Sequence, residues 1–186
     1  EEVRKIQTKL KRWGYYKGNV DGIYGSGTLE AVKYFQRKNG LKVDGIAGKE
    51  TLKAMGIMTS STSSSTSSSN SNDVNLLARL IYGEARGEPY TGQVAVGAVV
   101  MNRVKNSSFP NTISGVVYQS GSFDVVSDGQ INLSPNSTAK KAAQDALNGW
   151  DPSYGAIYYF NPSTATNKWI WSRPMTVTIG KHRFCK

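Results

Sequence analysis

Apolar residues recur at helical spacing in the first third of the chain. One such stretch ends at Gly14 and a second at Asn39-Gly40, where glycine favours the end of a helix. A third, shorter stretch begins at Thr51-Leu52. We therefore predict three short helices around one core, with these members: Ile6, Leu10, Trp13, Leu29, Val32, Phe35, Leu41 and Leu52.

A repeated segment connects these helices. Residues 20–32 (VDGIYGSGTLEAV) and 43–55 (VDGIAGKETLKAM) are identical at eight of thirteen positions, at a shift of 23 residues. Each copy has an Asp-Gly-Ile-x-Gly turn, in which Asp21 or Asp44 can accept hydrogen bonds from nearby backbone amides. The repeat contains no catalytic constellation, and turn chemistry accounts for its Asp and Gly residues.

The polar pattern divides the chain. Residues 59–72 read TSSTSSSTSSSNSN, without one apolar side chain, so they cannot bury enough surface to offset the entropy lost on ordering. We predict a flexible Ser/Thr-rich linker over 59–72, a small domain over 1–58 and a larger domain over 73–186.

A carboxylic acid interrupts the apolar face of the next predicted helix. Asp73 is a plausible N-cap, and the helix over 73–88 carries its apolar stripe at Val74, Leu77, Ile81 and Ala85. Glu84 falls inside this apolar arc because it lies seven residues after Leu77 and three after Ile81. Burial among apolar groups raises the pKa of a carboxyl, which suits a general acid. The alternative is an ordinary ion pair of Glu84 with Arg79, Arg86 or Arg103.

Other polar residues of the larger domain are candidates for substrate contact. Glu88 lies four residues beyond Glu84, where Gly87 and Pro89 indicate that the helix is ending. The next helix, over 92–104, is apolar nearly all round and should cross the middle of the domain, with Gln93, Asn102 and Arg103 as its polar side chains. A third helix, over 138–148, is amphipathic.

The last part of the larger domain has β-type patterning. Short strands are predicted over 156–160, 175–179 and 182–185, so the fold class is α+β. Aromatic area is concentrated here, in Tyr158, Tyr159, Phe160, Trp169 and Trp171. Such a cluster beside a buried acid suits a saccharide, whose rings offer apolar C–H faces, although each ring alone is also explained by core packing.

Charge narrows the class of partner. Lys+Arg 23 against Asp+Glu 13 gives a net charge of +10, which favours nucleic acid, acidic lipid or an anionic wall polymer. Both parts are positive, with 12 basic and 6 acidic residues in 1–58 and 11 and 7 in 73–186. No basic cluster with interleaved aromatics is present, so nucleic-acid binding is a minor alternative and we expect no nucleic acid as partner.

The single cysteine and single histidine argue against a disulfide and against a zinc site. One Cys (Cys185) excludes an internal disulfide, and with one His (His182) it cannot supply a zinc site dominated by His and Cys. We expect no metal and no cofactor, which disfavours zinc-dependent amidases. No stretch approaches the ~20 apolar residues of a spanning helix, and the start, EEVRKIQ, has no hydrophobic signal core. We expect a mature or trimmed chain without an integral membrane span.

The small domain resembles a known binding module. From Gln7 to Thr51 it follows the pattern QxxLxxxGYYxGxxDGxxGxxTxxAVxxFQxxxGLxxDGxxGxxT, which is similar to the three-helix peptidoglycan-binding domain of bacterial wall hydrolases. The resemblance implies non-catalytic attachment to the glycan wall.

The larger domain resembles the SleB/CwlJ family of spore cortex-lytic hydrolases. The resemblance is carried by IYGEARGEPYTGQVAVGAVVMNRV, FP (109–110), VVYQSGSF (116–123), YYFNP (158–162) and HRF (182–184). The order of binding repeat, linker and hydrolase is that of the SleB branch, since CwlJ lacks the binding module. It implies a fold like a small lysozyme or lytic transglycosylase, with Glu84 as catalytic glutamate. The expected substrate contacts are Glu88, Gln93, Asn102, Phe123, Tyr158, Tyr159 and Phe160.

A second carboxylate for glycoside cleavage is hard to find, because Asp124, Asp128, Asp145 and Asp151 lie in predicted loops or on a solvated helix face. A single acid suffices for a lytic transglycosylase, which cleaves the β-1,4 bond between N-acetylmuramic acid and N-acetylglucosamine and leaves a 1,6-anhydro end. The alternatives are a hydrolytic muramidase that uses one of these Asp residues and a non-catalytic wall-binding protein.

The resemblance also implies where and with what the protein works. We expect it to be exported to the spore cortex or envelope and to act during germination. Its expected partners are peptidoglycan glycan strands and a regulatory spore protein, and we expect a monomer.

Overall fold

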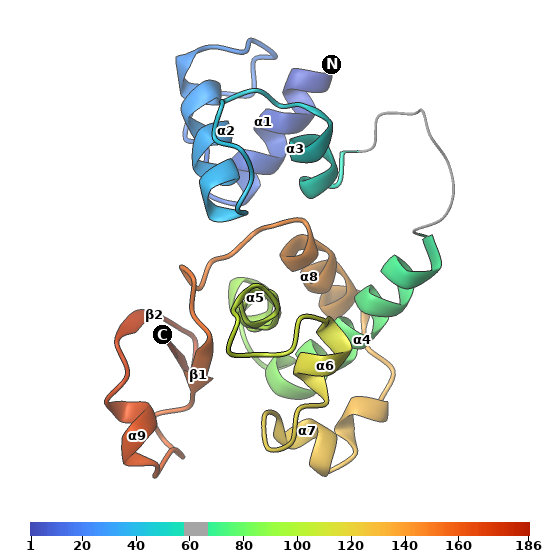
Figure 1. Ribbon diagram of the computed structural model, residues 1–186, viewed down its shortest axis with the longest axis vertical. Helices are drawn as coiled ribbons and strands as arrows, with labels where there is room; N and C mark the ends of the chain where they lie inside the picture. Colours follow the sequence, from blue (N-terminus) through green and yellow to red (C-terminus); the bar gives the residue numbers. More distant parts are fainter. Residues whose placement is uncertain (58–66) are drawn as a thin grey trace. The chain divides into compact units, whose positions relative to one another are not determined.

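The computed structural model describes residues 1–57 and 67–186. The chain divides into two compact units, Glu1–Ser63 and Ser64–Lys186 (Figure 1). Most of the predicted linker, residues 59–66, lies outside the described residues, and the domain boundaries at 58 and 73 stay predictions.

The first unit consists of three helices, as the apolar spacing predicts: α1 (Glu2–Arg12), α2 (Ser26–Lys38) and α3 (Lys49–Ala54). Trp13 stacks on Phe35 at 5.6 Å between ring centroids, and both rings are buried. Leu29 and Leu41 of the predicted core are only partly buried. Met55, which was not predicted, is fully buried and belongs to the core.

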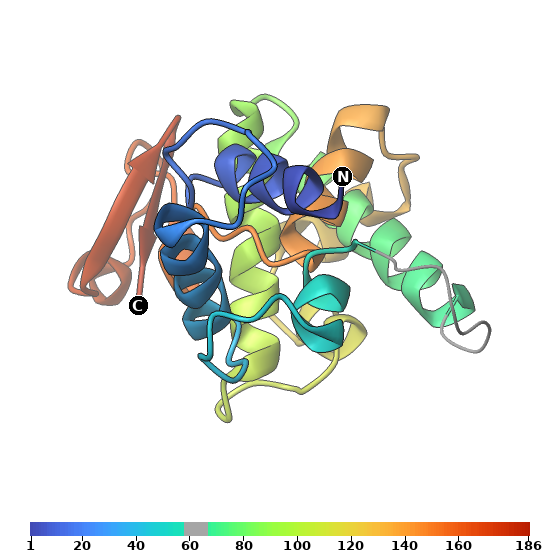
Figure 2. The same cartoon turned by 90° about the horizontal axis from the view of Figure 1, so that it is seen from above.

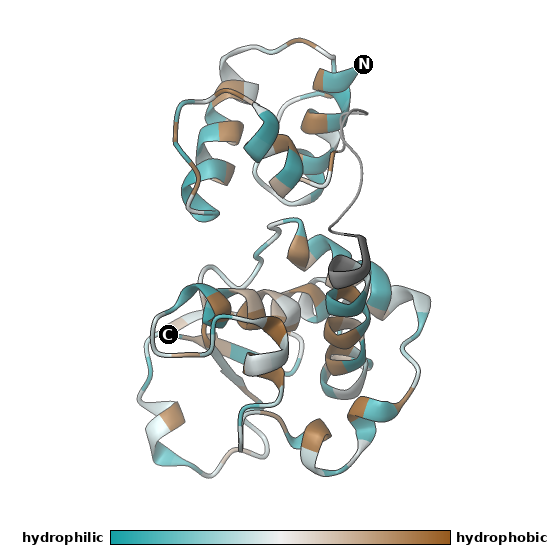
Figure 3. Ribbon diagram, turned by 45° about the vertical axis from the view of Figure 1, so that its right-hand side comes forward, coloured by the Kyte–Doolittle hydropathy of each residue, from teal (hydrophilic) through white to brown (hydrophobic). Residues whose placement is uncertain are grey.

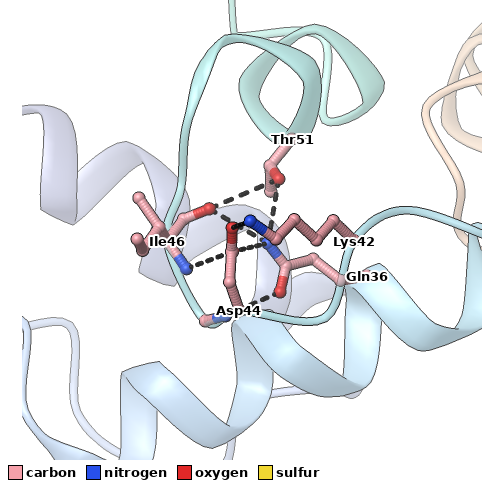
Figure 4. A network of polar contacts seen from close by, with 6 residues as sticks. Gln36, Lys42, Asp44, Ile46 and Thr51 are labelled. Atoms are coloured by element: carbon pink, nitrogen blue, oxygen red, sulfur yellow. Dashed lines mark hydrogen bonds and ion pairs between the residues drawn. The ribbon is translucent and has the colours of Figure 1, made fainter.

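Two matching polar networks hold the repeated turns. Gln36 lies buried on α2, where its Nε2 donates to Asp44 Oδ1, the Ile46 carbonyl and Thr51 Oγ1 at 3.0 to 3.1 Å, and its Oε1 accepts from Gly45 N (Figure 4). Gln7 on α1 makes the same four contacts with the first repeat, to Asp21, Ile23, Thr28 and Gly22. The predicted Asx turns are present, because Asp21 and Asp44 each accept from the amide two residues on. A buried glutamine therefore organises each repeat.

The second unit is built on three helices: α4 (Ser67–Ala85), α5 (Tyr90–Lys105) and α8 (Ser137–Leu147). Helix α5 is buried over Gly92–Val100, as its apolar sequence predicts. A Cβ at Gly97 would lie 2.9 Å from Ala146 Cβ, so this glycine permits the close contact of α5 with α8. Hydrophobic residues recur along α4 (Figure 3), where Leu77, Leu80 and Ile81 are fully buried.

One expectation for α4 is wrong. The helix begins at Ser67, so Asp73 is not its N-cap, and residues 67–72 of the predicted flexible linker are helical. Once the packed turns at Leu77 and Ile81 have formed, extending the helix backward adds a hydrogen bond for each residue fixed, without the cost of nucleation. Low intrinsic propensity of Ser and Asn was therefore not sufficient to end the helix at Asp73.

Shorter elements connect these helices: α6 (Ile113–Val117), α7 (Asp124–Ser127) and the 3₁₀ helix η1 (Gln130–Asn132). An antiparallel sheet follows, with strand order β1-β3-β2: β1 (Tyr158–Phe160), β2 (Met175–Ile179) and β3 (His182–Cys185), with α9 (Lys168–Trp171) before β2. The sheet and α9 lie to one side of the helices of this unit (Figures 1 and 2). The α+β prediction is thus confirmed, and the predicted strands are present except that β1 begins at Tyr158.

Candidate active site

Glu84 lies in the last turn of α4, between helix α7 and the sheet. Its side chain is partly buried, and its Oε1 is shielded from solvent. The preceding residue must be glycine, because a Cβ at Gly83 would lie 2.7 Å from Val125 Cγ1 of α7. Gly83 therefore allows α4 and α7 to pack closely, and Glu84 places its carboxyl beside this contact.

The sheet supplies the hydrogen-bond partner of this carboxyl. Tyr159 Oη donates to Glu84 Oε2 at 2.6 Å. Tyr159 is the central residue of β1, pairs with Phe184 of β3, and packs its ring against His182 and Phe184 at 5.0 and 5.7 Å between centroids. Burial and the adjacent Glu84 raise the pKa of the Tyr159 hydroxyl well above its ordinary value, so it remains protonated and donates.

Burial also raises the pKa of Glu84, which is the main influence on it. The Tyr159 hydroxyl and the backbone amide of Val125 oppose this rise, while the negative charges of Asp124 and Asp128 add to it. The amide makes no regular hydrogen bond to Oε1, which has no such partner among the described residues. Glu84 can therefore hold its proton to higher pH than an exposed glutamate, as a general acid requires.

The expected alternative, an arginine ion pair, is not found. Within residues 1–57 and 67–186, Glu84 makes no ion pair with Arg79, Arg86 or Arg103. Arg86 instead donates to Gln130 Oε1. A carboxyl held by a neutral hydroxyl can lose and regain a proton more readily than one fixed beside a permanent cation.

Arg103 is buried under aromatic rings, which its place near the end of a helix did not predict. Its guanidinium lies 5.1 Å from the ring centroids of Phe109 and Phe123 and 5.4 Å from that of Tyr158, and its Nε donates to the Ile157 carbonyl at 2.7 Å. Burial lowers its pKa, while Tyr159, Tyr158 and Glu84 raise it. This cation therefore stabilises the loop that leads into β1.

Three of the expected substrate contacts have structural partners. Glu88 Oε2 accepts from the Lys181 amide in the β2–β3 turn at 2.9 Å, and Gln93 Nε2 donates to the Glu88 carbonyl at 3.2 Å. Asn102 donates to Asp151 Oδ2 and to the Ala156 carbonyl. None of the three contacts the Glu84 carboxyl directly, and their roles in substrate binding stay predictions.

The expected aromatic contacts divide over the two faces of β1. Tyr159 points to Glu84, whereas Tyr158 and Phe160 contact Trp169 and Trp171 at 5.1 and 5.0 Å between centroids. Phe160 is buried, as is Phe123 under Arg103. The structure thus brings only Tyr159, of the seven expected substrate contacts, into a hydrogen bond with the acid.

Asp124 is a carboxylate whose proximity to Glu84 has no sequence signature. It is exposed at the start of α7, its side chain has no hydrogen bond or ion pair within the described parts of the chain, and its charge raises the pKa of Glu84. The other candidates have structural partners: Asp128 binds Gln130, Asp145 accepts from Tyr90 Oη, and Asp151 binds Asn102 and Ser153. Asp124 is therefore the one that could assist Glu84.

The described residues form neither a metal-binding cluster nor a membrane span. No group of three or more His, Cys, Asp or Glu side chains is placed to hold a metal ion anywhere in 1–57 or 67–186. No described helix is long and apolar enough to cross a membrane.

Comparison with known proteins gives concordant similarities for both units. The cell wall hydrolase family profile matches residues 87–185, and the peptidoglycan binding domain profile matches residues 1–55. The spore cortex-lytic enzyme of Bacillus cereus is 48% identical over 215 residues, which cover 100% of this chain and 83% of the relative.

Two solved structures are similar to the second unit. The catalytic domain of the Bacillus cereus SleB protein is 63% identical, with a TM-score of 0.60, covering 62% of this chain and 91% of that chain. The catalytic domain of the germination-specific lytic transglycosylase SleB from Bacillus anthracis is 56% identical, also with a TM-score of 0.60, covering 69% of this chain and 100% of that chain.

Proposed function

The chain belongs to the spore cortex-lytic enzyme family, and from this premise we propose that it is a lytic transglycosylase with Glu84 as its catalytic acid. Membership establishes the coarser activity, which is lysis of cell wall peptidoglycan in germination. We propose that the bond cleaved is the β-1,4 bond between N-acetylmuramic acid and N-acetylglucosamine of the spore cortex, with a 1,6-anhydro product.

One observation carries this proposal. Glu84 is a partly buried carboxyl with a raised pKa, bound to the neutral hydroxyl of Tyr159 and to no cation in the described chain. Its proton passes to the oxygen of the leaving N-acetylglucosamine as the C1–O4 bond breaks. The resulting carboxylate then takes the proton of the muramic C6 hydroxyl, and O6 closes on C1. One residue thus serves as acid and then as base, and no water is consumed.

The second candidate is a hydrolytic muramidase. Asp124 favours it, because an exposed carboxylate near a buried acid can activate water on the other side of a sugar ring. The two reactions give products that differ by one water. Mass spectrometry of fragments released from purified cortex therefore separates anhydro ends from reducing ends.

Substitution tests the role of Glu84. Glu84→Gln should abolish release of anhydro fragments from purified cortex while the protein still pellets with the wall. Asp124→Asn is the matched control, which should retain activity if no second carboxylate is needed. Near wild-type cleavage by Glu84→Gln would refute the proposal, and attachment of the wild-type protein without any fragments would indicate a non-catalytic wall-binding protein.

We also propose a location, an oligomeric state and a form of regulation for this enzyme. The relatives named above are spore cortex-lytic enzymes, and we expect this chain to be exported to the cortex, to work as a monomer and to be held silent by a regulatory spore protein. Size-exclusion chromatography coupled to light scattering checks the monomer.

A further inference from the structure

The outer face of the sheet carries stacked aromatic and cationic side chains that the proposed chemistry does not use. Trp169 meets Tyr158 and Trp171 meets Phe160 in edge-to-face contacts. The guanidinium of Arg173 lies 5.1 Å from the Trp169 ring centroid, and that of Arg183 lies 5.1 Å from the Trp171 centroid. We call these six residues the aromatic–basic face.

Core packing does not explain the two tryptophans. Trp169 is 50% exposed and Trp171 is 44% exposed, and helix α9, which carries both, has no buried residue. Large exposed aromatic side chains that are held in place mark contact surfaces. Each indole is fixed by an aromatic edge and an arginine, so its free area is preorganised for a ligand.

The segment that carries this face is basic. Residues 152–186 contain five Lys or Arg residues and no Asp or Glu. Arg173 and Arg183 form no ion pair with an Asp or Glu side chain of the described chain, and Arg173 Nε donates to the main-chain oxygen of Lys186, which fixes its orientation. Their remaining donors suit carboxylates, and the indole faces suit the C–H faces of sugars.

Strand β1 connects this face to the candidate acid. Side chains alternate along a strand, so Tyr159 turns to Glu84 while Tyr158 and Phe160, its neighbours, turn to the tryptophans. A chain molecule bound at the acid could therefore continue over the sheet onto the aromatic–basic face.

We propose that the aromatic–basic face binds a peptide-bearing stretch of the glycan strand outside the cleaved bond. Sugar rings stack on Trp169 and Trp171, and carboxylates of the peptides attached to muramic acid pair with Arg173 and Arg183. This inference rests on the proposed function and adds to it a preference for strands that carry peptides.

Kinetics with soluble glycan strands test this proposal in the full chain. Strands with peptides retained are compared with the same strands stripped of peptide, and anhydro ends are counted. Trp169→Ala/Trp171→Ala should raise KM about tenfold on both substrates, while Arg173→Gln/Arg183→Gln should raise KM on peptide-bearing strands only, each with kcat unchanged. Tyr118→Ala, which removes another exposed aromatic, is the control and should change neither.

A second measurement is independent of whether the variants fold. In the Glu84→Gln protein, peptide-bearing strands should protect tryptophan fluorescence from iodide quenching, and added salt should weaken this protection. Unchanged KM in folded variants, absence of protection, or equal protection by duplex DNA or anionic lipid vesicles would overturn the inference. A wild-type protein that releases no anhydro ends would instead overturn the proposed function.

Discussion

The hydroxyl of Tyr159 is the interaction whose removal tests the site most directly. Tyr159→Phe deletes one oxygen and leaves the ring packed between His182 and Phe184. In the wild-type protein this hydroxyl donates to Glu84 at 2.6 Å and lowers the pKa of the carboxyl, opposing the effect of burial. Without it, the pKa of Glu84 should rise further, since only the backbone amide of Val125 still opposes burial and the nearby negative charges.

The expected loss in rate follows from the strength of this bond. A hydrogen bond to a charged group contributes about 1.5–3 kcal/mol. The carboxylate forms as Glu84 gives up its proton, so a bond that favours the carboxylate lowers the barrier. If about 1.4 kcal/mol of it is present in the transition state, kcat should fall about tenfold.

The assay is the initial rate of anhydro-end formation on soluble glycan strands across a range of pH. Tyr159→Phe should lower kcat and move the alkaline limb of the profile to higher pH, because the acid holds its proton longer. Tyr118→Phe is the matched control: its hydroxyl is exposed and has no hydrogen bond in the described chain, so rate and profile should stay as in the wild type. A profile that moves to lower pH, or an identical effect of both variants, would refute the assignment of Glu84 as the acid held by Tyr159.

Three further predictions concern stability and attachment. Glu84→Gln should raise the free energy of unfolding at neutral pH but not at acidic pH. The folded-state pKa of Glu84 is raised, so the stability that the protonated carboxyl contributes is lost as the pH rises from the ordinary pKa of 4.5 through the raised pKa. Urea denaturation at both pH values measures this. Glu88→Ala should cost about 0.5–1.5 kcal/mol by removing the exposed hydrogen bond to the Lys181 amide, and Glu88→Gln should restore most of it, again by urea denaturation. Gln36→Ala should destabilise the first unit by about 2–4 kcal/mol and abolish pelleting with walls, while cleavage of soluble strands continues.

Periodic features of the sequence predicted the fold well. The apolar spacing of the first unit, the Asp turns of the repeat and the buried helix α5 are all found, because each depends on residues a few positions apart. The position of Glu84 within an apolar arc likewise predicted its burial and the direction of its pKa shift.

Contacts between distant segments were not predictable in this way. The stacking of Arg103 on Phe109 and Phe123, the Glu88 contact with Lys181 and the approach of Asp124 to Glu84 join elements that share no sequence period. Such contacts depend on tertiary packing. The early start of α4 has the same origin, since packing further along the helix overrides the weak propensity of its first turn.

The two bonds that complete the site span long stretches of chain, with Tyr159 and Glu84 separated by 75 residues and Lys181 and Glu88 by 93. During synthesis the acid emerges well before the strand that holds it and before the hairpin turn at Lys181. A nascent chain, or one shortened by proteolysis ahead of this turn, thus carries the glutamate without its scaffold. Holding the glutamate in place therefore depends on segments that are made much later than the glutamate itself.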